Sequence, residues 1–385
     1  MVGDSPRTMQ LQERAPGPGT LGRYCEEKLS AICDRTSFAP QRAEILSIYR
    51  DLSSSWSSRP LDARPSWSGL TCDLTPFEMC IGMNRAGKQE LGFIVEPQGE
   101  PPRPDTYWAQ TRALFTVLAS RWAVDLSRLR RIEDLVHPQI GPRPSESEGG
   151  SCTGYGVLFS GSQRRFKFWF NPDCKGVAQT EALCHEVMHR LGVADAWLWT
   201  REQLPETASL LVGLELSGAS QGRVTVYVRV QDPDVAKLER VAALSDRYVE
   251  GEIQDFWESL RWSHFPVMRP HLLELHLIES APRPVSCSLQ FTTFPLLPND
   301  ALARRCIRAS LAHYGISRHF YDEVLGSLTA GGDLEEETLV HSWVTYRRDE
   351  HGEPRLGVYF PGRAYLRTFG ALGMSRRTQW PYPDA

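Results

Sequence analysis

The sequence predicts a mixed α/β fold of the α+β type, in which ten antiparallel strands close into a barrel with helices outside. Two segments, residues 164–172 and 223–230, alternate strictly between apolar and polar residues, which is typical of strands with one apolar face. A hairpin followed by helices also recurs five times along the 385 residues. Ten such strands can remove both sheet edges by closing into a barrel, whereas two separate sandwiches are the structural alternative.

The polar faces of these two segments have an unusual composition. In residues 164–172, three phenylalanines alternate with Arg165, Lys167, Trp169 and Asn171. In residues 223–230, four valines alternate with Arg223, Thr225, Tyr227 and Arg229. Solvated strand faces usually carry Lys, Glu and Thr rather than large rings. We therefore predict that these faces line an enclosed polar interior, with a solvated face as the alternative.

The elements follow in a regular order. The five expected hairpins, whose second strands begin near residues 90, 164, 222, 285 and 355, cover 70–97, 155–172, 209–230, 271–294 and 339–361. Helical spacing predicts helices over 20–38, 40–56, 105–136, 179–203, 234–262 and 300–329, and a short final helix over 363–369. The repeat places helices after every hairpin.

Composition limits the class of protein. The net charge of −4 gives no general attraction to nucleic acid, and no apolar run reaches the roughly 18 to 20 residues that cross a bilayer. Nine scattered cysteines without a C-x-x-C pair predict reduced thiols in a cytoplasmic protein. Residues 1–20 lack a secretory apolar region and are expected to be a disordered tail before a single barrel domain over residues 21–385.

Five segments, in this order and at matching strand positions, resemble the dimethylallyltryptophan synthase family of aromatic prenyltransferases, most closely its bacterial branch. They are LTPFEMCIGMN, FKFWFNP, RVTVYVRV and the two strands of HSWVTYRRDEHGEPRLGVYF. The resemblance, over about residues 65–362, implies the prenyltransferase (ABBA) barrel. It also implies a metal-independent transferase that moves a dimethylallyl group from dimethylallyl diphosphate to the indole ring of L-tryptophan or a related indole, with no cofactor.

The resemblance implies which residues bind the diphosphate. Without a metal, Lys and Arg donors must stabilise a leaving group of about three negative charges. The family's donor positions correspond here to Lys167 and Arg223, with Gln290 as a polar partner. The fifth hairpin adds Arg347 and Arg355 as further candidates.

The family also uses aromatic rings to shield the allylic cation and a carboxylate to orient the indole. Glu78 matches the carboxylate that accepts the indole N–H. Aromatic faces exclude water and stabilise positive charge. The matching shield positions are Trp169, Tyr227, Trp343 and Tyr359.

Three departures from the family pattern stand out. The arginine that the family usually has near Gly92 is absent, so Arg85 or Lys88 is a candidate replacement. Thr225 stands where the family often has lysine, and residues 144–163 contain no lysine that could act as a base. Rearomatisation therefore needs another base, for which Glu274 and His276 are the candidates. The alkylated carbon, the exact indole, the prenyl length and the oligomeric state remain open.

One short motif suggests a different enzyme class. His185, Glu186 and His189 form H-E-x-x-H, with Asp195 further on, which on a helix can bind zinc in a metalloprotease. The expected helix lies between two hairpins, where the barrel needs an outer helix, and its apolar residues recur at four-residue spacing. We therefore keep a zinc protease and a non-catalytic small-molecule-binding barrel as alternatives to the prenyltransferase.

Overall fold

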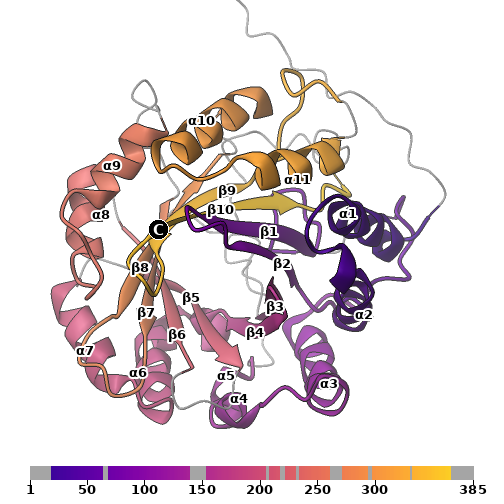
Figure 1. Ribbon diagram of the computed structural model, residues 1–385. Coiled ribbons are helices and arrows are strands. Elements are labelled where there is room, and N and C mark those ends of the chain that lie inside the picture. Colours follow the sequence, from indigo (N-terminus) through magenta and orange to yellow (C-terminus); the bar gives the residue numbers. More distant parts are fainter. Residues whose placement is uncertain are drawn as a thin grey trace, which may run out of the picture.

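The computed structural model describes residues 19–63, 68–138, 153–204, 208–216, 222–230, 234–260, 271–293, 297–329 and 332–365. Ten strands form a closed antiparallel barrel in the order β1-β10-β9-β8-β7-β6-β5-β4-β3-β2, and helices surround it (Figure 1). The strands are β1 (Phe77–Asn84), β2 (Gln89–Val95), β3 (Thr153–Ser160), β4 (Gln163–Phe170), β5 (Ala208–Leu216), β6 (Val224–Arg229), β7 (His271–Leu277), β8 (Ser286–Thr292), β9 (Trp343–Arg348) and β10 (Pro354–Pro361). The predicted barrel is therefore confirmed, and every second strand begins within two residues of its expected start.

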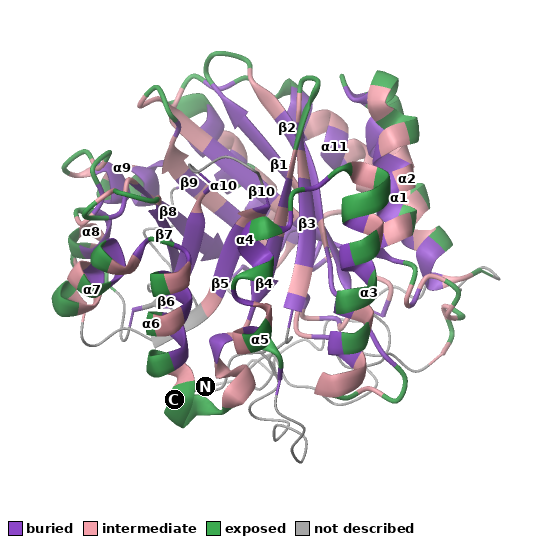
Figure 2. Ribbon diagram, turned by 90° about the horizontal axis from the view of Figure 1, so that it is seen from below, coloured by how far each residue is buried: buried purple, intermediate pink, exposed green. Residues whose placement is uncertain are grey.

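The alternation of each strand separates two environments. Phe166, Phe168 and Phe170 of β4 point outward and are at most 5% exposed, because helices cover that face. Phe168 packs against Tyr155 of β3 with ring centroids 5.3 Å apart. Figure 2 shows the strands largely buried while the helices expose one side. The apolar core thus lies between the strands and the helices, and the polar face of each strand points into the barrel.

The outer layer contains eleven α-helices within the described residues. They are α1 (Leu21–Arg35), α2 (Arg42–Leu52), α3 (Pro104–Trp122), α4 (Ser127–Arg130), α5 (Glu133–Val136), α6 (Thr180–Arg190), α7 (Ala194–Gln203), α8 (Val235–Ala242), α9 (Glu252–Ser259), α10 (Asp300–His313) and α11 (His319–Thr329). Short 3₁₀ turns occupy Ala39–Gln41, Pro172–Lys175 and Val177–Gln179. Along this described chain, no helix is both long and apolar enough to cross a membrane.

Several predicted boundaries were wrong. The helical region 105–136 is interrupted after α3, where Ala123 has a left-handed φ of 51°, and the region 179–203 is interrupted at Gly192, with a φ of 72°. Residues 70–76 form no strand, because the Asp73 carboxylate accepts hydrogen bonds from the hydroxyls of Thr71 and Thr75 at 2.8 and 2.7 Å. Such local side-chain bonds compete with strand pairing.

Both ends of the chain lie largely outside the described residues. Of the proposed tail, only Gly19 and Thr20 are described, and the Thr20 hydroxyl caps α1 by accepting the backbone N–H of Arg23. Of the expected final helix, only Arg363–Tyr365 are described, and these are not helical. Eight of the nine cysteines fall within the described segments, where all eight are free thiols and none is exposed.

Candidate active site

The barrel encloses a chamber lined by the inward-facing side chains of its strands. Its volume is about 220 Å³, whereas one water needs only about 10 to 15 Å³ of comparable space. Whereas Arg85 and Lys88 do not line this chamber, twelve other residues that the sequence predicted for the site do: Glu78, Lys167, Trp169, Arg223, Tyr227, Glu274, His276, Gln290, Trp343, Arg347, Arg355 and Tyr359. The alternation of the strands therefore brings together residues separated by up to 281 positions.

A cluster of five cations forms the charged part of the chamber, and we call it the cation cluster: Arg165 and Lys167 of β4, Arg223 beside β6, Arg347 of β9 and Arg355 of β10. Two carboxylates neutralise part of it. Glu90 pairs with Arg165 at 2.9 Å and with Arg355, and Glu215 pairs with Arg223 at 3.5 Å. Five cations against two paired carboxylates leave the cluster positive.

Burial affects the pKa values in this cluster. It lowers the pKa of the Lys167 ammonium to about 8, and the carboxylate of Glu274 opposes this shift. It also lowers the pKa of Arg347 to about 10, with Arg223 and Arg165 adding to the effect. Water stabilises these charges poorly inside the barrel, so an anion that pairs with them is bound more strongly than at the surface.

The structure finds contributors that the sequence analysis missed. Alternation already placed Arg165 on the inner face beside Lys167, but the sequence analysis gave it no role in the site. Alternation also places Glu90 on the polar face of its strand, but its partner Arg355 lies 265 positions away, so the pair itself could not be predicted. Arg85 and Lys88, the candidate replacements near Gly92, instead pair with Glu353 and Glu350 at the hairpin ends and do not line the chamber.

Aromatic rings continue the wall beyond the cation cluster. The indole N–H of Trp169 donates to the hydroxyl of Tyr227 at 2.8 Å, and the Lys167 ammonium lies 5.6 Å from the centre of the Trp169 ring. Trp343 of β9 and Tyr359 of β10 are register partners on neighbouring strands, and both line the chamber. Burial raises the pKa of Tyr359 well above its usual value, so this phenol remains neutral. The rings provide a wall of neutral π faces next to the cations.

Glu78 lies on β1 and is only 3% exposed. The hydroxyl of Ser342 donates to its Oε1 atom at 2.6 Å. Burial raises the pKa of Glu78 from 4.5 to about 8, while the hydrogen bond from Ser342 acts in the opposite direction. Glu78 is therefore a buried acceptor that lines the chamber and holds one hydrogen bond from the protein, at Oε1.

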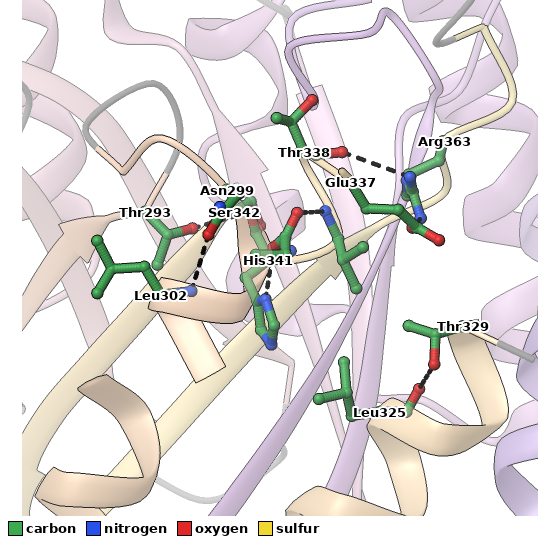
Figure 3. Close-up of polar contacts among 12 residues, drawn as sticks. Thr293, Asn299, Leu302, Leu325, Thr329, Glu337, Thr338, His341, Ser342 and Arg363 are labelled. Carbon is green, nitrogen blue, oxygen red and sulfur yellow. Dashed lines mark hydrogen bonds and ion pairs between the residues drawn. The ribbon is translucent and has the colours of Figure 1, made fainter. Parts of the chain in front are cut away.

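Ser342 is itself held by the segment before β9. Figure 3 shows His341 and Ser342 beside Thr293 and the start of α10. The buried carboxylate of Asp300 accepts the backbone N–H of His341 at 2.9 Å and contacts its Nδ1 atom at 2.6 Å. The opposite ring nitrogen, Nε2, lies 2.9 Å from the hydroxyl of Tyr321. This network fixes the segment that carries Ser342, and the Ser342 hydroxyl in turn orients Glu78.

The two candidate bases differ in their contacts. Both ring nitrogens of His276 are close to hydroxyls, with Nδ1 3.1 Å from Thr225 and Nε2 2.9 Å from Ser288. Burial, together with the charges of the cation cluster, holds the pKa of His276 well below its usual value. Glu274 accepts a hydrogen bond from Gln290, and its other oxygen lies 3.7 Å from His276. A carboxylate can accept a proton without disrupting that network, so Glu274 is the better candidate.

The H-E-x-x-H motif lies on α6, outside the barrel. His185 and His189 are exposed, and Glu186 pairs with Arg190 at 2.7 Å. The apolar face of the helix, with Val187 fully buried, packs inward as expected. Among the described residues, no group of three His, Cys, Asp or Glu side chains is arranged to hold a metal. The zinc protease alternative is therefore not supported.

Comparisons with known proteins agree with this geometry. The family model described as tryptophan dimethylallyltransferase matches residues 39–269. The 6-dimethylallyltryptophan synthase from Micromonospora olivasterospora, solved with DMASPP and Trp, is 25% identical, with a TM-score of 0.81 over 90% of this chain and 98% of that one. By sequence, no curated protein matches the chain.

Two more distant structures share the fold. The 5-dimethylallyltryptophan synthase from Streptomyces coelicolor is 18% identical, with a TM-score of 0.80 over 90% of this chain and 99% of that one. AnaPT from Neosartorya fischeri is 14% identical, with a TM-score of 0.72 over 87% of this chain and 91% of that one.

Proposed function

Because the chain belongs to the tryptophan dimethylallyltransferase family, we propose that it transfers a dimethylallyl group from dimethylallyl diphosphate to the indole ring of L-tryptophan or a related indole. The observation that carries this proposal is the chamber, where the cation cluster, the aromatic rings and the buried carboxylate of Glu78 line one enclosed space. The DMASPP and Trp bound to the Micromonospora enzyme are ligands of the matching chemistry.

The cation cluster binds the diphosphate and promotes cleavage of the C–O bond. The bond's electron pair leaves with the diphosphate, which carries about three negative charges, and a dimethylallyl cation remains. Arg347 supports this role because its Nε atom is buried without a hydrogen-bond partner in the described part of the chain. Gln290 adds a neutral donor. Since these side chains supply the positive charge, we propose that the reaction needs no metal ion.

The aromatic wall protects the cation until the indole attacks. Trp169, Tyr227, Trp343 and Tyr359 exclude water, and each ring that faces the cation stabilises it by roughly 0.5 to 2 kcal/mol. Glu78 accepts the indole N–H, which orients the ring and raises its electron density. An indole carbon then forms the new C–C bond, and the proton of that carbon passes to Glu274.

The experiment is incubation of the purified protein with L-tryptophan and dimethylallyl diphosphate, with and without EDTA, followed by NMR of the product. We expect a prenylated indole in both cases. Glu78→Gln keeps the size of the side chain but weakens the acceptor, so turnover should fall by about 10- to 10⁴-fold. Glu186→Gln on α6, outside the barrel, is the matched control and should retain activity. Full turnover in the Glu78 variant would remove that residue from the mechanism.

A further inference from the structure

A buried carboxylate lies behind the cation cluster. Glu90 of β2 is fully buried, and it pairs with Arg165 of β4 at 2.9 Å and with Arg355 of β10. Both arginines line the chamber, whereas Glu90 is not among the described residues that do so. The carboxylate therefore contacts two cations of the site without facing a substrate itself.

Arg355 reaches Glu90 by crossing the strand that lies between them. Gly82 of β1 is the register partner of Glu90 on one side and of Gly357 on the other, and Arg355 shares the strand face of Gly357. A methyl group placed on Gly82 would lie 2.8 Å from Cζ of Arg355, so the guanidinium lies over this glycine. The Nε atom of Arg355 is buried without a hydrogen-bond partner in the described part of the chain. The ion pair with Glu90 therefore fixes the position of the guanidinium.

This crossing supplies a cation at a place where the first hairpin supplies none. The described residues of β1 and β2 add no lysine or arginine to the chamber, and Arg85 and Lys88 pair at the hairpin ends instead. Ordering a long arginine side chain costs conformational entropy, and an ion pair inside the protein removes this cost before a ligand arrives. Glu90 can therefore prepare Arg355 for an anion, although it also adds one negative charge nearby.

We propose that Glu90 is a positioning residue of the diphosphate site, which holds Arg355 over Gly82 so that its guanidinium is available to the leaving group. The proposal rests on the proposed function, and it gives Glu90 a role opposite to that of a simple counter-charge. A counter-charge weakens the binding of a polyanion, whereas a positioning residue strengthens it. The two roles therefore predict effects of opposite sign when the charge of Glu90 is removed.

Calorimetry with inorganic pyrophosphate, without added metal, measures this sign independently of turnover. In Glu90→Gln, which keeps the size of the side chain, we expect the Kd of pyrophosphate to rise by at least about fivefold over wild type. Glu353→Gln is the matched control, because Glu353 pairs with Arg85 outside the chamber, and it should leave this Kd unchanged. Tighter or unchanged binding to Glu90→Gln, or no binding to wild type, would overturn the proposal.

Gly82→Ala tests the position of Arg355 without changing any charge. The three atoms nearest to the added methyl group all belong to the flexible end of Arg355, so the fold should tolerate the change while the guanidinium moves away. This variant should also raise the Kd of pyrophosphate, and it covers the case in which Glu90→Gln does not fold. Gly326→Ala on α11, where the methyl group would lie 3.9 Å from Arg35, is the matched control. An unchanged Kd in Gly82→Ala would contradict the placement of Arg355.

Double substitutions show whether Glu90 acts through Arg355. Arg355→Met keeps most of the length of the side chain and removes its charge. In that background, neither Glu90→Gln nor Gly82→Ala should weaken pyrophosphate binding further, because the group that they position is absent. A weakening as large as that seen with Arg355 present would contradict the proposal.

Turnover separates this inference from the proposed function. Glu90→Gln should raise KM for dimethylallyl diphosphate and leave KM for tryptophan within about twofold, because Glu90 supports only the charged part of the chamber. An equal rise in both KM values would indicate a general disruption of the chamber and contradict the positioning role. If wild type forms no product, the proposed function fails, whereas the pyrophosphate measurements still decide the role of Glu90.

Discussion

Removing the hydroxyl of Ser342 should change the pH dependence of the reaction more than its maximum rate. The Ser342 Oγ atom donates to Glu78 at 2.6 Å in a site where both residues are less than 10% exposed. The backbone of Ser342 is held independently, since its N–H donates to the carbonyl of Tyr359 and its carbonyl accepts the N–H of Thr293 at 2.8 Å. Ser342→Ala therefore removes one hydrogen bond and little else.

The magnitude follows from the charge of the acceptor. A hydrogen bond to a charged group contributes about 1.5 to 3 kcal/mol, and each pKa unit corresponds to about 1.4 kcal/mol. The Ser342 hydroxyl stabilises the ionised form of Glu78, so its loss raises the pKa of this carboxyl above its present value of about 8. Asp73 raises that pKa further, and the neutral thiols of Cys72 and Cys80 and the phenol of Tyr359 are the other titratable neighbours.

The assay is kcat/KM for tryptophan from pH 6 to 10 at saturating dimethylallyl diphosphate. At saturating dimethylallyl diphosphate, the bound diphosphate pairs with the Lys167 ammonium and keeps it charged, so Glu78 sets the pH dependence. Because the carboxylate is the active form, activity rises with pH, and the midpoint of this rise should move up by about one to two pH units in Ser342→Ala. Activity below pH 8 falls, and activity at high pH recovers. Ser327→Ala on α11 is the matched control, and thermal unfolding monitors stability. An unmoved midpoint, or a loss of equal size at every pH, would refute this role of Ser342.

Three other outcomes are expected. Lys167→Gln should lower kcat/KM for dimethylallyl diphosphate by about 10²- to 10³-fold. In wild type this kcat/KM should fall above about pH 8, the pKa at which the free Lys167 ammonium loses its charge, and the variant should not show this fall. A reduction of less than threefold in the variant would contradict the role of Lys167. Phe168→Ala should reduce the free energy of unfolding in urea by about 3 to 5 kcal/mol, because the ring is fully buried; a change under 1 kcal/mol would be inconsistent with that packing. The double substitution His185→Ala and His189→Ala should leave activity within about twofold, and a chelator-sensitive activity restored by zinc would contradict this outcome.

The sequence by itself determined which residues face the inside of the barrel. Alternation has a period of two and is a local property, so RRFKFWF already places Lys167 and Trp169 on one face and the phenylalanines on the other. The five hairpins can also be recognised from local sequence patterns, and their recurrence predicts the closed barrel. The residues implied by the family resemblance followed from matching strand positions, and all of them line the chamber.

Only the tertiary structure decided which inward-facing residues meet. The pairing of Glu90 with Arg355 across Gly82 and the hydrogen bond from Ser342 to Glu78 depend on the register between strands. Register is set by closure of the whole barrel, and alternation within one strand carries no information about it. The loop at residues 70–76 and the break at Ala123 likewise depend on local hydrogen bonds and backbone conformations that periodicity does not record.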